Sequence, residues 1–425
     1  MQKPDSKVRN SCGSRLGQVL GGLVFTGLLA CSNLGPAQAK PVPAAKTAKA
    51  GKAQAKTGAA KAGKAQGSKK AAPKTASKAR AVPKPAPKSA SVASPGAAAA
   101  PAASAALGAG AAAASLTGKT EHAISEAELA ALRRRAEEGD APAQYALGMA
   151  YKRGLGLSPD IQTAAHWYLS AAMQGHASAQ SELGLMHAHG NGVVRDDAQA
   201  VQWYRKAAEQ GEAVAQSNLG LMLAAGRGVA RDEAQALHWF ERAAGQGEAA
   251  AQYALGVMHA TGQGATEDAA LALQWFLKAA AQGHADAQFN AGLLYAEGGP
   301  VERDLVQAAH WFQKAAEQGH ASAQLNLGVF YANGQGVTTS DEQAAKWLER
   351  AAQQGDALAQ SNLASLYAAG KGVERDSSLA YFWSWLAAHK DRSLSAKRDS
   401  LAKELDETQR MRVERQAQAW KPGKS

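Results

Sequence analysis

Cysteine is nearly absent from this 425-residue chain, which has only Cys12 and Cys31, both close to its amino terminus. No disulfide and no cysteine-based metal site can therefore form after residue 31. The remainder of the chain offers no compact group of catalytic or metal-ligating residues either. We accordingly expect no catalytic residue, no cofactor and no metal site, and the chain is predicted not to be an enzyme.

Acidic residues are missing from residues 40–118, whereas residues 40–90 hold fourteen Lys and Arg. The same stretch lacks aromatic residues and nearly all large apolar ones. It cannot bury enough apolar surface to offset chain entropy, so we predict a disordered tether over residues 40–118. Residues 119–425 contain 29 Lys and Arg against 35 Asp and Glu. This mildly acidic balance argues against a nucleic-acid partner, despite the overall charge of +11.

Long hydrophobic runs are also missing, because the longest apolar stretch, residues 16–30, is too short for a comfortable membrane span. Basic residues precede it and small residues follow it, which is typical of a secretory signal. Residues 28–31 resemble the bacterial lipobox, which implies a signal peptide over residues 1–31 and lipidation of Cys31. Cleavage after Ala39, giving a signal over residues 1–39, and an uncleaved anchor are the alternatives. Ser32 resembles the residue of outer-membrane lipoproteins at this position. We therefore expect an exported, periplasmic protein with a lipid anchor in the outer membrane, or a soluble periplasmic one.

A 36-residue period dominates the rest of the sequence. One glutamine and one tryptophan recur at this spacing in seven consecutive units: Gln144, Gln180, Gln216, Gln252, Gln288, Gln324 and Gln360, and Trp167, Trp203, Trp239, Trp275, Trp311, Trp347 and Trp383. A fixed period in this range is typical of a solenoid, in which each unit packs only on its neighbours. We interpret both rows as structural, with Gln as a hydrogen-bonding bracket between units and Trp as core.

Each unit predicts two helices, as residues 213–248 show. Apolar residues follow helix spacing in both halves, Gly226 ends the first helix, and Asp232 begins the second as its N-cap. Gly220 lies within the first helix, where Gly costs about 1 kcal/mol against Ala. Six of the seven units repeat this cost, which indicates that two helices approach closely there; Ala364 replaces the glycine in the last unit.

These units resemble the Sel1-like repeat, a relative of the tetratricopeptide repeat. Residues 321–337 read ASAQLNLGVFYANGQGV and residues 203–211 read WYRKAAEQG, both close to the family pattern. The resemblance implies an all-α fold, a right-handed α-solenoid of seven helix-turn-helix repeats over residues 141–392 with capping helices at both ends. The expected repeats are 141–176, 177–212, 213–248, 249–284, 285–320, 321–356 and 357–392. Local departures are Pro300 in a loop, and His187, Leu223 and His259 at an aromatic position.

Two flanking segments are predicted to cap the array. Residues 119–140 contain a capping box formed by Ser125 and Glu128. Residues 393–425 contain an amphipathic helix, broken near Asp406, whose apolar residues include Met411. A helix on the membrane surface is the alternative for the second segment.

The tetratricopeptide analogy implies a concave groove lined by the first helices, in which positions after each Gln contact a protein or peptide partner. The candidate groove residues are Asn218, Asn290, Asn326, Asn362, Tyr253 and Phe289. We therefore predict a non-enzymatic scaffold of the bacterial cell envelope. The alternative is a module that binds an anionic envelope polymer through the Lys-rich tether, and a hydrolase is a remote third.

Overall fold

The computed structural model describes residues 124–423, and all of their regular secondary structure is helical. The expected signal peptide, Cys31, the tether over residues 40–118 and residues 119–123 of the expected cap lie outside the described residues. In the described part of the chain, no helix has both the length and the apolar character that crossing a membrane requires.

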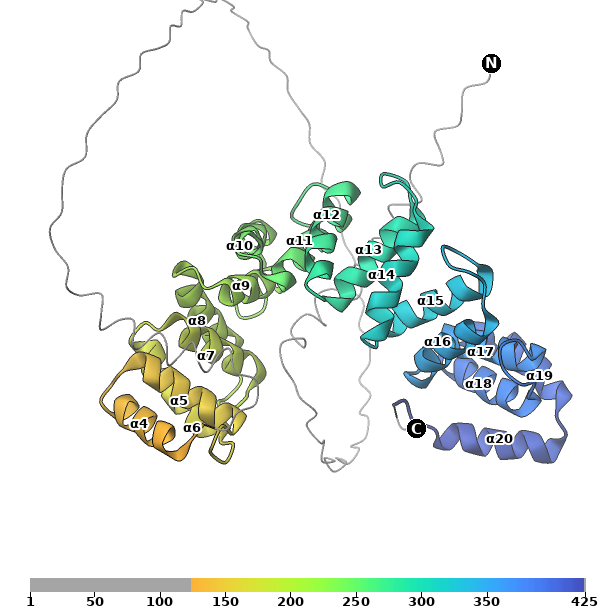
Figure 1. The fold of residues 1–425 in the computed structure, drawn as a ribbon, viewed down its shortest axis with the longest axis horizontal. Helices are drawn as coiled ribbons and strands as arrows, with labels where there is room; N and C mark the ends of the chain where they lie inside the picture. The colour runs from red at the N-terminus through yellow and green to blue at the C-terminus, as the bar shows by residue number, and fades with distance from the viewer. Residues whose placement is uncertain (1–123, 424–425) are drawn as a thin grey trace, which may run out of the picture. The chain divides into compact units, whose positions relative to one another are not determined.

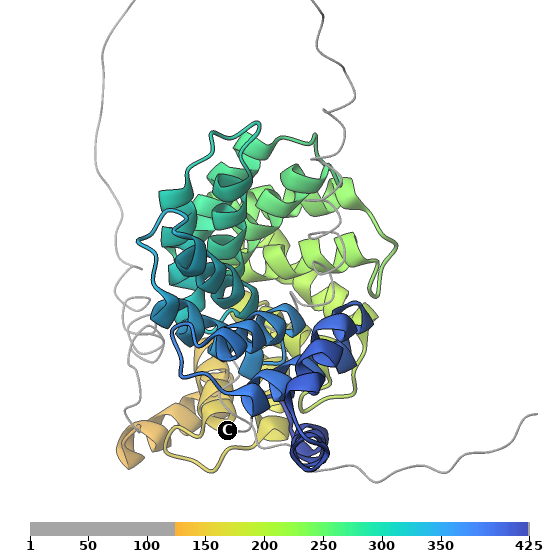
Figure 2. The same cartoon turned by 90° about the vertical axis from the view of Figure 1, so that its right-hand side faces the viewer.

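Each repeat unit consists of two antiparallel helices of similar length (Figure 1). The first helices are α5 Ala141–Arg153, α7 Ala177–His189, α9 Ala213–Ala225, α11 Ala249–Thr261, α13 Ala285–Glu297, α15 Ala321–Asn333 and α17 Ala357–Ala369. The second helices are α6 Ile161–Met173, α8 Asp197–Glu209, α10 Glu233–Gly245, α12 Ala269–Ala281, α14 Leu305–Glu317, α16 Asp341–Gln353 and α18 Ser377–Lys390. Each helix packs on the one before it and the one after it, which is the α-solenoid expected from the period (Figure 2).

Helices end and begin at the capping residues that the sequence predicts. Gly226 ends α9 in the left-handed conformation with φ 65°, which glycine adopts without steric cost. The Asp232 carboxylate accepts a hydrogen bond from the backbone N–H of Gln235 at the start of α10, so it satisfies one of the free donors there. Both predicted signals are confirmed in this unit.

The interior glycines of the first helices lie against a ring or branched side chain of the second helix. A Cβ added to Gly256 would stand 2.5 Å from Phe276, and one added to Gly220 would stand 2.7 Å from Phe240. The contact residue is the one that follows the tryptophan. These residues are at most 2% exposed: Tyr168, Tyr204, Phe240, Phe276, Phe312 and Leu348. The close approach predicted from the glycines is therefore made by this row.

The tryptophan row is less central than the sequence predicts. Trp203, Trp347 and Trp383 are buried, but the tryptophans of the other four units are only half-buried. Basic side chains cover the ring face in several units, as Lys278 does 3.7 Å from the ring centre of Trp275. Both positions lie on the apolar stripe of the second helix, and the side chain that points at the glycine takes the fully buried place.

Additional helices cover both ends of the array. At the amino-terminal end, α4 Glu126–Glu137 packs on α5 and begins with the capping box expected from Ser125 and Glu128. At the carboxy-terminal end, η2 Arg392–Leu394, α19 Ser395–Leu401, η3 Ala402–Glu404 and α20 Glu407–Ala419 follow α18. Asp406 caps α20, so the predicted break is confirmed. Met411 is 53% exposed and does not join the apolar contact face, whereas Val413 does.

Candidate binding surface

The repeated glutamines connect the helices within and between units. Gln216 donates its amide to the backbone carbonyl of Ala208 in the preceding unit, at 3.0 Å. Its Oε1 accepts a hydrogen bond from Gln246, at the end of the second helix of the same unit, at 2.8 Å. The repeated glutamines of the other units from Gln144 to Gln324 each donate to a backbone carbonyl and accept from a second glutamine in the same way. We call this repeated pattern the hydrogen-bond ladder. These amides are buried, and each is hydrogen-bonded through both its nitrogen and its oxygen, which assigns them to contacts inside the array.

This hydrogen-bond ladder changes in the last unit. Gln360 still donates to Ala352 O at 3.1 Å, but its buried Oε1 has no hydrogen-bond partner. Lys390 stands where the other units carry the second glutamine, and its ammonium donates to Gly355 O at 2.6 Å instead. The departure of this unit from the repeat pattern therefore costs one buried hydrogen bond.

Aromatic residues directly after the ladder glutamine stack on the histidine that ends their own unit. The ring centres of Tyr253 and His284 lie 4.6 Å apart, and those of Phe289 and His320 also lie 4.6 Å apart. Tyr145 and His176 form a similar stack at 4.7 Å. Each histidine is also the N-cap of the first helix of the following unit. The aromatic rings are therefore part of the contact between units, a role that the sequence alone did not suggest.

Two of the six candidate groove residues are occupied inside the array. Tyr253 is 7% exposed and Asn290 is 3% exposed, and the Asn290 amide donates to the Tyr253 hydroxyl at 3.3 Å. The expectation that both offer free groups to a partner is thus corrected, because the neighbouring unit already covers them. Phe289 stays half-buried beside His320.

The other three candidates, Asn218, Asn326 and Asn362, occupy one position of the repeat. Each is half-buried. Within residues 124–423, their side-chain amides have no hydrogen-bond partner. An asparagine amide supplies both a donor and an acceptor, which are the groups that an extended backbone pairs with. These amides therefore mark a polar row along the first helices.

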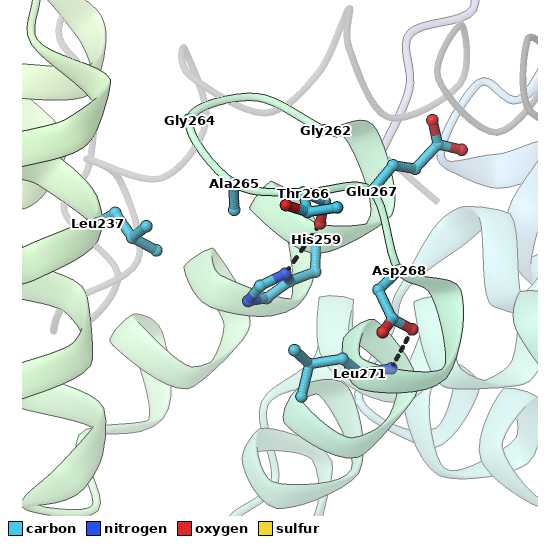
Figure 3. A pocket seen from close by; sticks show the side chains of 9 residues that line it. All are labelled: Leu237, His259, Gly262, Gly264, Ala265, Thr266, Glu267, Asp268 and Leu271. Carbon is cyan, nitrogen blue, oxygen red and sulfur yellow. Dashed lines mark hydrogen bonds between the residues drawn. The ribbon is translucent and has the colours of Figure 1, made fainter. Parts of the chain in front are cut away.

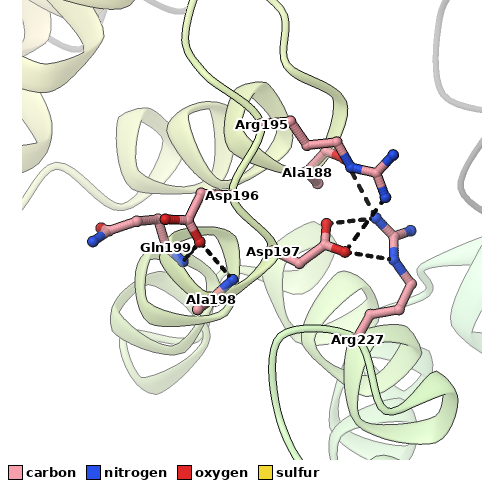
Figure 4. Close-up of polar contacts among 7 residues, drawn as sticks. All are labelled: Ala188, Arg195, Asp196, Asp197, Ala198, Gln199 and Arg227. Atoms are coloured by element: carbon pink, nitrogen blue, oxygen red, sulfur yellow. Dashed lines mark hydrogen bonds and ion pairs between the residues drawn. The ribbon is translucent and has the colours of Figure 1, made fainter.

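The most elaborate charged cluster joins the second and third units (Figure 4). Arg227 binds both carboxylate oxygens of Asp197, from Nη2 at 2.6 Å and from Nε at 3.1 Å. These hydrogen bonds hold the pKa of Asp197 below its ordinary value, even though burial opposes the shift. Arg227 also donates to Ala188 O at 3.4 Å. The guanidinium is engaged by protein groups, so the cluster joins the loop after α9 to the start of α8 and the end of α7.

A wide depression of about 780 Å³ lies at the loop between α11 and α12 (Figure 3). Its polar residues maintain the loop. His259 Nδ1 lies 3.1 Å from Thr266 O, and Asp268 accepts from Leu271 N at 2.9 Å as the N-cap of α12. His259 and Thr266 both line the wall, but the imidazole contacts the Thr266 backbone carbonyl and no hydrogen bond joins it to the Thr266 hydroxyl. Covalent catalysis requires such a contact between base and nucleophile.

The histidines that precede the repeat tryptophan in alternate units do not converge. His166, His238 and His310 each lie edge-on against the tryptophan that follows them. Among residues 124–423, no three His, Cys, Asp or Glu side chains are grouped so that they could hold a metal ion.

A family model for the Sel1 repeat matches the chain seven times in succession, at residues 141–176, 177–212, 213–248, 249–284, 285–320, 321–356 and 357–391. A solved Sel1 repeat protein from Oxalobacter formigenes is 30% identical, with a TM-score of 0.51, over 57% of this chain and 96% of that one. The solved c5321, described as a protective antigen present in uropathogenic Escherichia coli strains displaying an SLR fold, is 32% identical. Its TM-score is 0.48, over 69% of this chain and 71% of that one. No curated protein matches the sequence.

Proposed function

Because the chain belongs to the Sel1 repeat family, whose members are generally protein-interaction scaffolds, we propose that it binds an extended segment of another protein along its first helices. Binding involves no chemical step, and the array holds its partner in place. The observation that carries this proposal is the row of unpaired amides of Asn218, Asn326 and Asn362, at one position of three units.

The position of these residues favours an extended backbone as the ligand. Equivalent residues repeat along the array: Asn326 and Asn362 lie on the neighbouring sixth and seventh units, and Asn218 lies on the third. Their amides can pair with separate peptide groups of one strand-like segment. Phe289 adds a half-exposed aromatic surface on one of the intervening units. Pairing with backbone groups gives affinity, and the residues that differ between units give selectivity.

Capture of partners by the full chain tests this function. The double variant Asn218→Ala/Asn326→Ala is compared with Gln202→Ala/Gln274→Ala, which changes two exposed polar residues at one position of the second helices. A partner enriched from solubilised envelopes by the wild type and by the control, but not by the Asn variant, supports the proposal. Equal capture by both variants contradicts it.

The proposal extends to the cell envelope, where the signal sequence, Cys31 and Ser32 direct the chain. Lipidation of Cys31 anchors it, and the tether over residues 40–118 carries the array away from the membrane. Incorporation of a labelled fatty acid that is lost in Cys31→Ser supports the lipid anchor. Labelling that persists in this variant contradicts it.

A second candidate function is the binding of an anionic envelope polymer. It is supported by the fourteen Lys and Arg in residues 40–90, a stretch that contains no acidic residue. Such a segment is attracted to anionic polymers of the envelope through its net charge. Deletion of residues 40–90 is then expected to abolish sedimentation with cell-wall material. Unchanged sedimentation rules this function out.

A further inference from the structure

Lys397 occupies an unusual position at the carboxy-terminal end of the array. It projects from α19, and its ammonium donates to Ser361 O at 2.9 Å and to Ser365 Oγ at 2.7 Å, both on α17. Within residues 124–423, no carboxylate lies within ion-pair distance of it. Burial lowers the pKa of Lys397, and no neighbouring charge contributes to the shift. An ammonium carries three N–H donors, so one of them remains available.

Ser365 departs from the pattern of the other units. The equivalent residue is aliphatic or methionine in all six of them: Met149, Leu185, Leu221, Val257, Leu293 and Val329. Ser365 is exposed, whereas Leu221 and Val257 are buried. In the last unit a hydroxyl that contacts a lysine thus replaces a side chain that helps form the core elsewhere.

A cavity of about 300 Å³ lies at this place, between α17 and α19. It is lined by Ser365, Ala368, Ala369, Lys397, Ser400 and Leu401. We name it the Lys397 pocket. Its walls are mainly small and apolar, with the ammonium and the hydroxyls as the polar groups. This volume is at the lower end of the range for ligand sites, so the pocket suits a small group.

We infer that the Lys397 pocket binds the C-terminal carboxylate of a peptide whose last side chain is small and apolar. The remaining N–H of the ammonium binds the carboxylate, and Ala368, Ala369 and Leu401 contact the last side chain. The Ser365 hydroxyl, which donates to Ser361 O at 3.2 Å and accepts from Lys397, holds the ammonium in place. A carboxylate supplies the counter-ion that Lys397 lacks, and hydrogen bonds to an ionised group are stronger than neutral ones. The inference rests on the proposed function, because Asn362, one of the proposed binding residues, lies on the same helix α17 as Ser361 and Ser365.

The probes are N-acetyl-alanyl-alanine and its C-terminal amide, added to the full chain and followed by ligand-observed NMR. The acid is expected to bind at least about tenfold more tightly than the amide, because the amide loses a charge-assisted hydrogen bond. The methyl group of the last alanine is expected to receive the strongest saturation transfer. Propionate, which has a carboxylate but no peptide group, is expected to bind more weakly than the acid.

Three variants separate the pocket from its surroundings. Lys397→Met is expected to abolish the preference for the acid, whereas Lys403→Met, an exposed lysine in the same end segment, is expected to retain it. Ser365→Leu restores the residue type of the other units and is expected to fill the pocket and block binding. This variant also provides the test if loss of the Lys397 hydrogen bonds unfolds the end segment.

Equal binding of the acid and the amide, equal binding of propionate, or full binding by Ser365→Leu overturns the assignment. So does an absence of binding by the wild type. These results are distinguishable from a failure of the proposed function, because partner capture that depends on Asn218 and Asn326 is measured separately. If that capture is retained while the acid and the amide bind alike, the groove function stands and the pocket assignment fails.

Discussion

Gln246 donates a side-chain hydrogen bond to Gln216, and this 2.8 Å contact joins the two helices of the third unit. Gln216 is 1% exposed and donates in turn to Ala208 O of the preceding unit. One amide therefore fixes both the geometry of a unit and its position on its neighbour. Because the arrangement recurs along the array, it explains why the glutamine is needed in each unit.

Replacement of Gln216 by methionine keeps the size of the side chain and removes both hydrogen bonds. We expect a loss of about 1–3 kcal/mol in the free energy of unfolding, because the Gln246 amide and the Ala208 carbonyl lose a buried partner. The measurement is urea unfolding of the full chain. Gln202→Met, at an exposed position of α8, is the control and should change stability by no more than about 0.5 kcal/mol. Equal effects of both substitutions would show that the ladder does not stabilise the array.

The last unit offers the opposite experiment. Lys390→Gln restores the residue of the other units, and its amide can reach both the orphaned Oε1 of Gln360 and the Gly355 carbonyl. Gln354 makes the equivalent two bonds, to Gln324 Oε1 at 2.8 Å and to Gly319 O at 2.9 Å. We expect stabilisation by about 1 kcal/mol, seen as a higher thermal midpoint. When Lys390→Gln is combined with Gln360→Met, the gain in thermal midpoint should be smaller. A gain of unchanged size in this double variant would exclude the hydrogen bond to Gln360 as its cause.

Alanine substitution is expected to change stability in opposite directions at two helix glycines, Gly256 in the interior of α11 and Gly245 at the end of α10. Gly256→Ala places a Cβ 2.5 Å from the Phe276 ring, which is buried and cannot move freely. We expect destabilisation by about 1–3 kcal/mol. At Gly245, the last residue of α10, an added Cβ meets nothing within 4 Å. Gly245→Ala should therefore stabilise the protein by about 0.5–1 kcal/mol, because alanine has the higher helix propensity. Both values come from urea unfolding, and effects of the same sign would contradict the packing described.

The stacked histidines predict a dependence of stability on pH. His284 Nδ1 accepts a hydrogen bond from Ala287 N at 3.3 Å, and burial lowers the pKa of this imidazole despite the opposing influence of Asp286. The folded state therefore favours the neutral ring. Its contribution is fully present above the unfolded pKa of about 6.5 and is lost as the pH falls through the lower folded pKa.

Comparison with His284→Asn isolates this contribution, because asparagine can also cap a helix but does not titrate. The stability difference between wild type and variant is expected to be largest near pH 8 and to shrink toward pH 5. Chemical unfolding at several pH values measures it. A difference that stays constant over this range would show that His284 does not titrate on unfolding.

The sequence predicted the repeated parts of the fold well, because those parts depend on short-range signals. Gly226 and Asp232 act on the backbone of their own helix, so their spacing alone marks where helices end and begin. Spacing alone could not predict which of the neighbours Trp239 and Phe240 is more deeply buried, since both lie on one apolar stripe. A signal was nevertheless present. The unit with Ala364 in place of glycine also carries the small Ser384 in place of the ring.

The surface was harder to predict, because it depends on contacts between units. Whether Tyr253 is available to a partner depends on His284, 31 positions later, which stacks on its ring. The Lys397 pocket depends on where α19 lies against α17, which no repeat pattern specifies. Residues that vary between units therefore need the structure before they can be divided into contacts within the array and groups free for a ligand.

The most direct test of partner binding along the first helices is site-specific photo-cross-linking in cells. A benzoylphenylalanine placed at Asn326 is compared with one at Gln274, an exposed residue of α12. We predict a discrete cross-linked partner at position 326 and none at position 274. A partner cross-linked at 274 but not at 326, or equally at both, would contradict the assignment of the binding surface to the first helices.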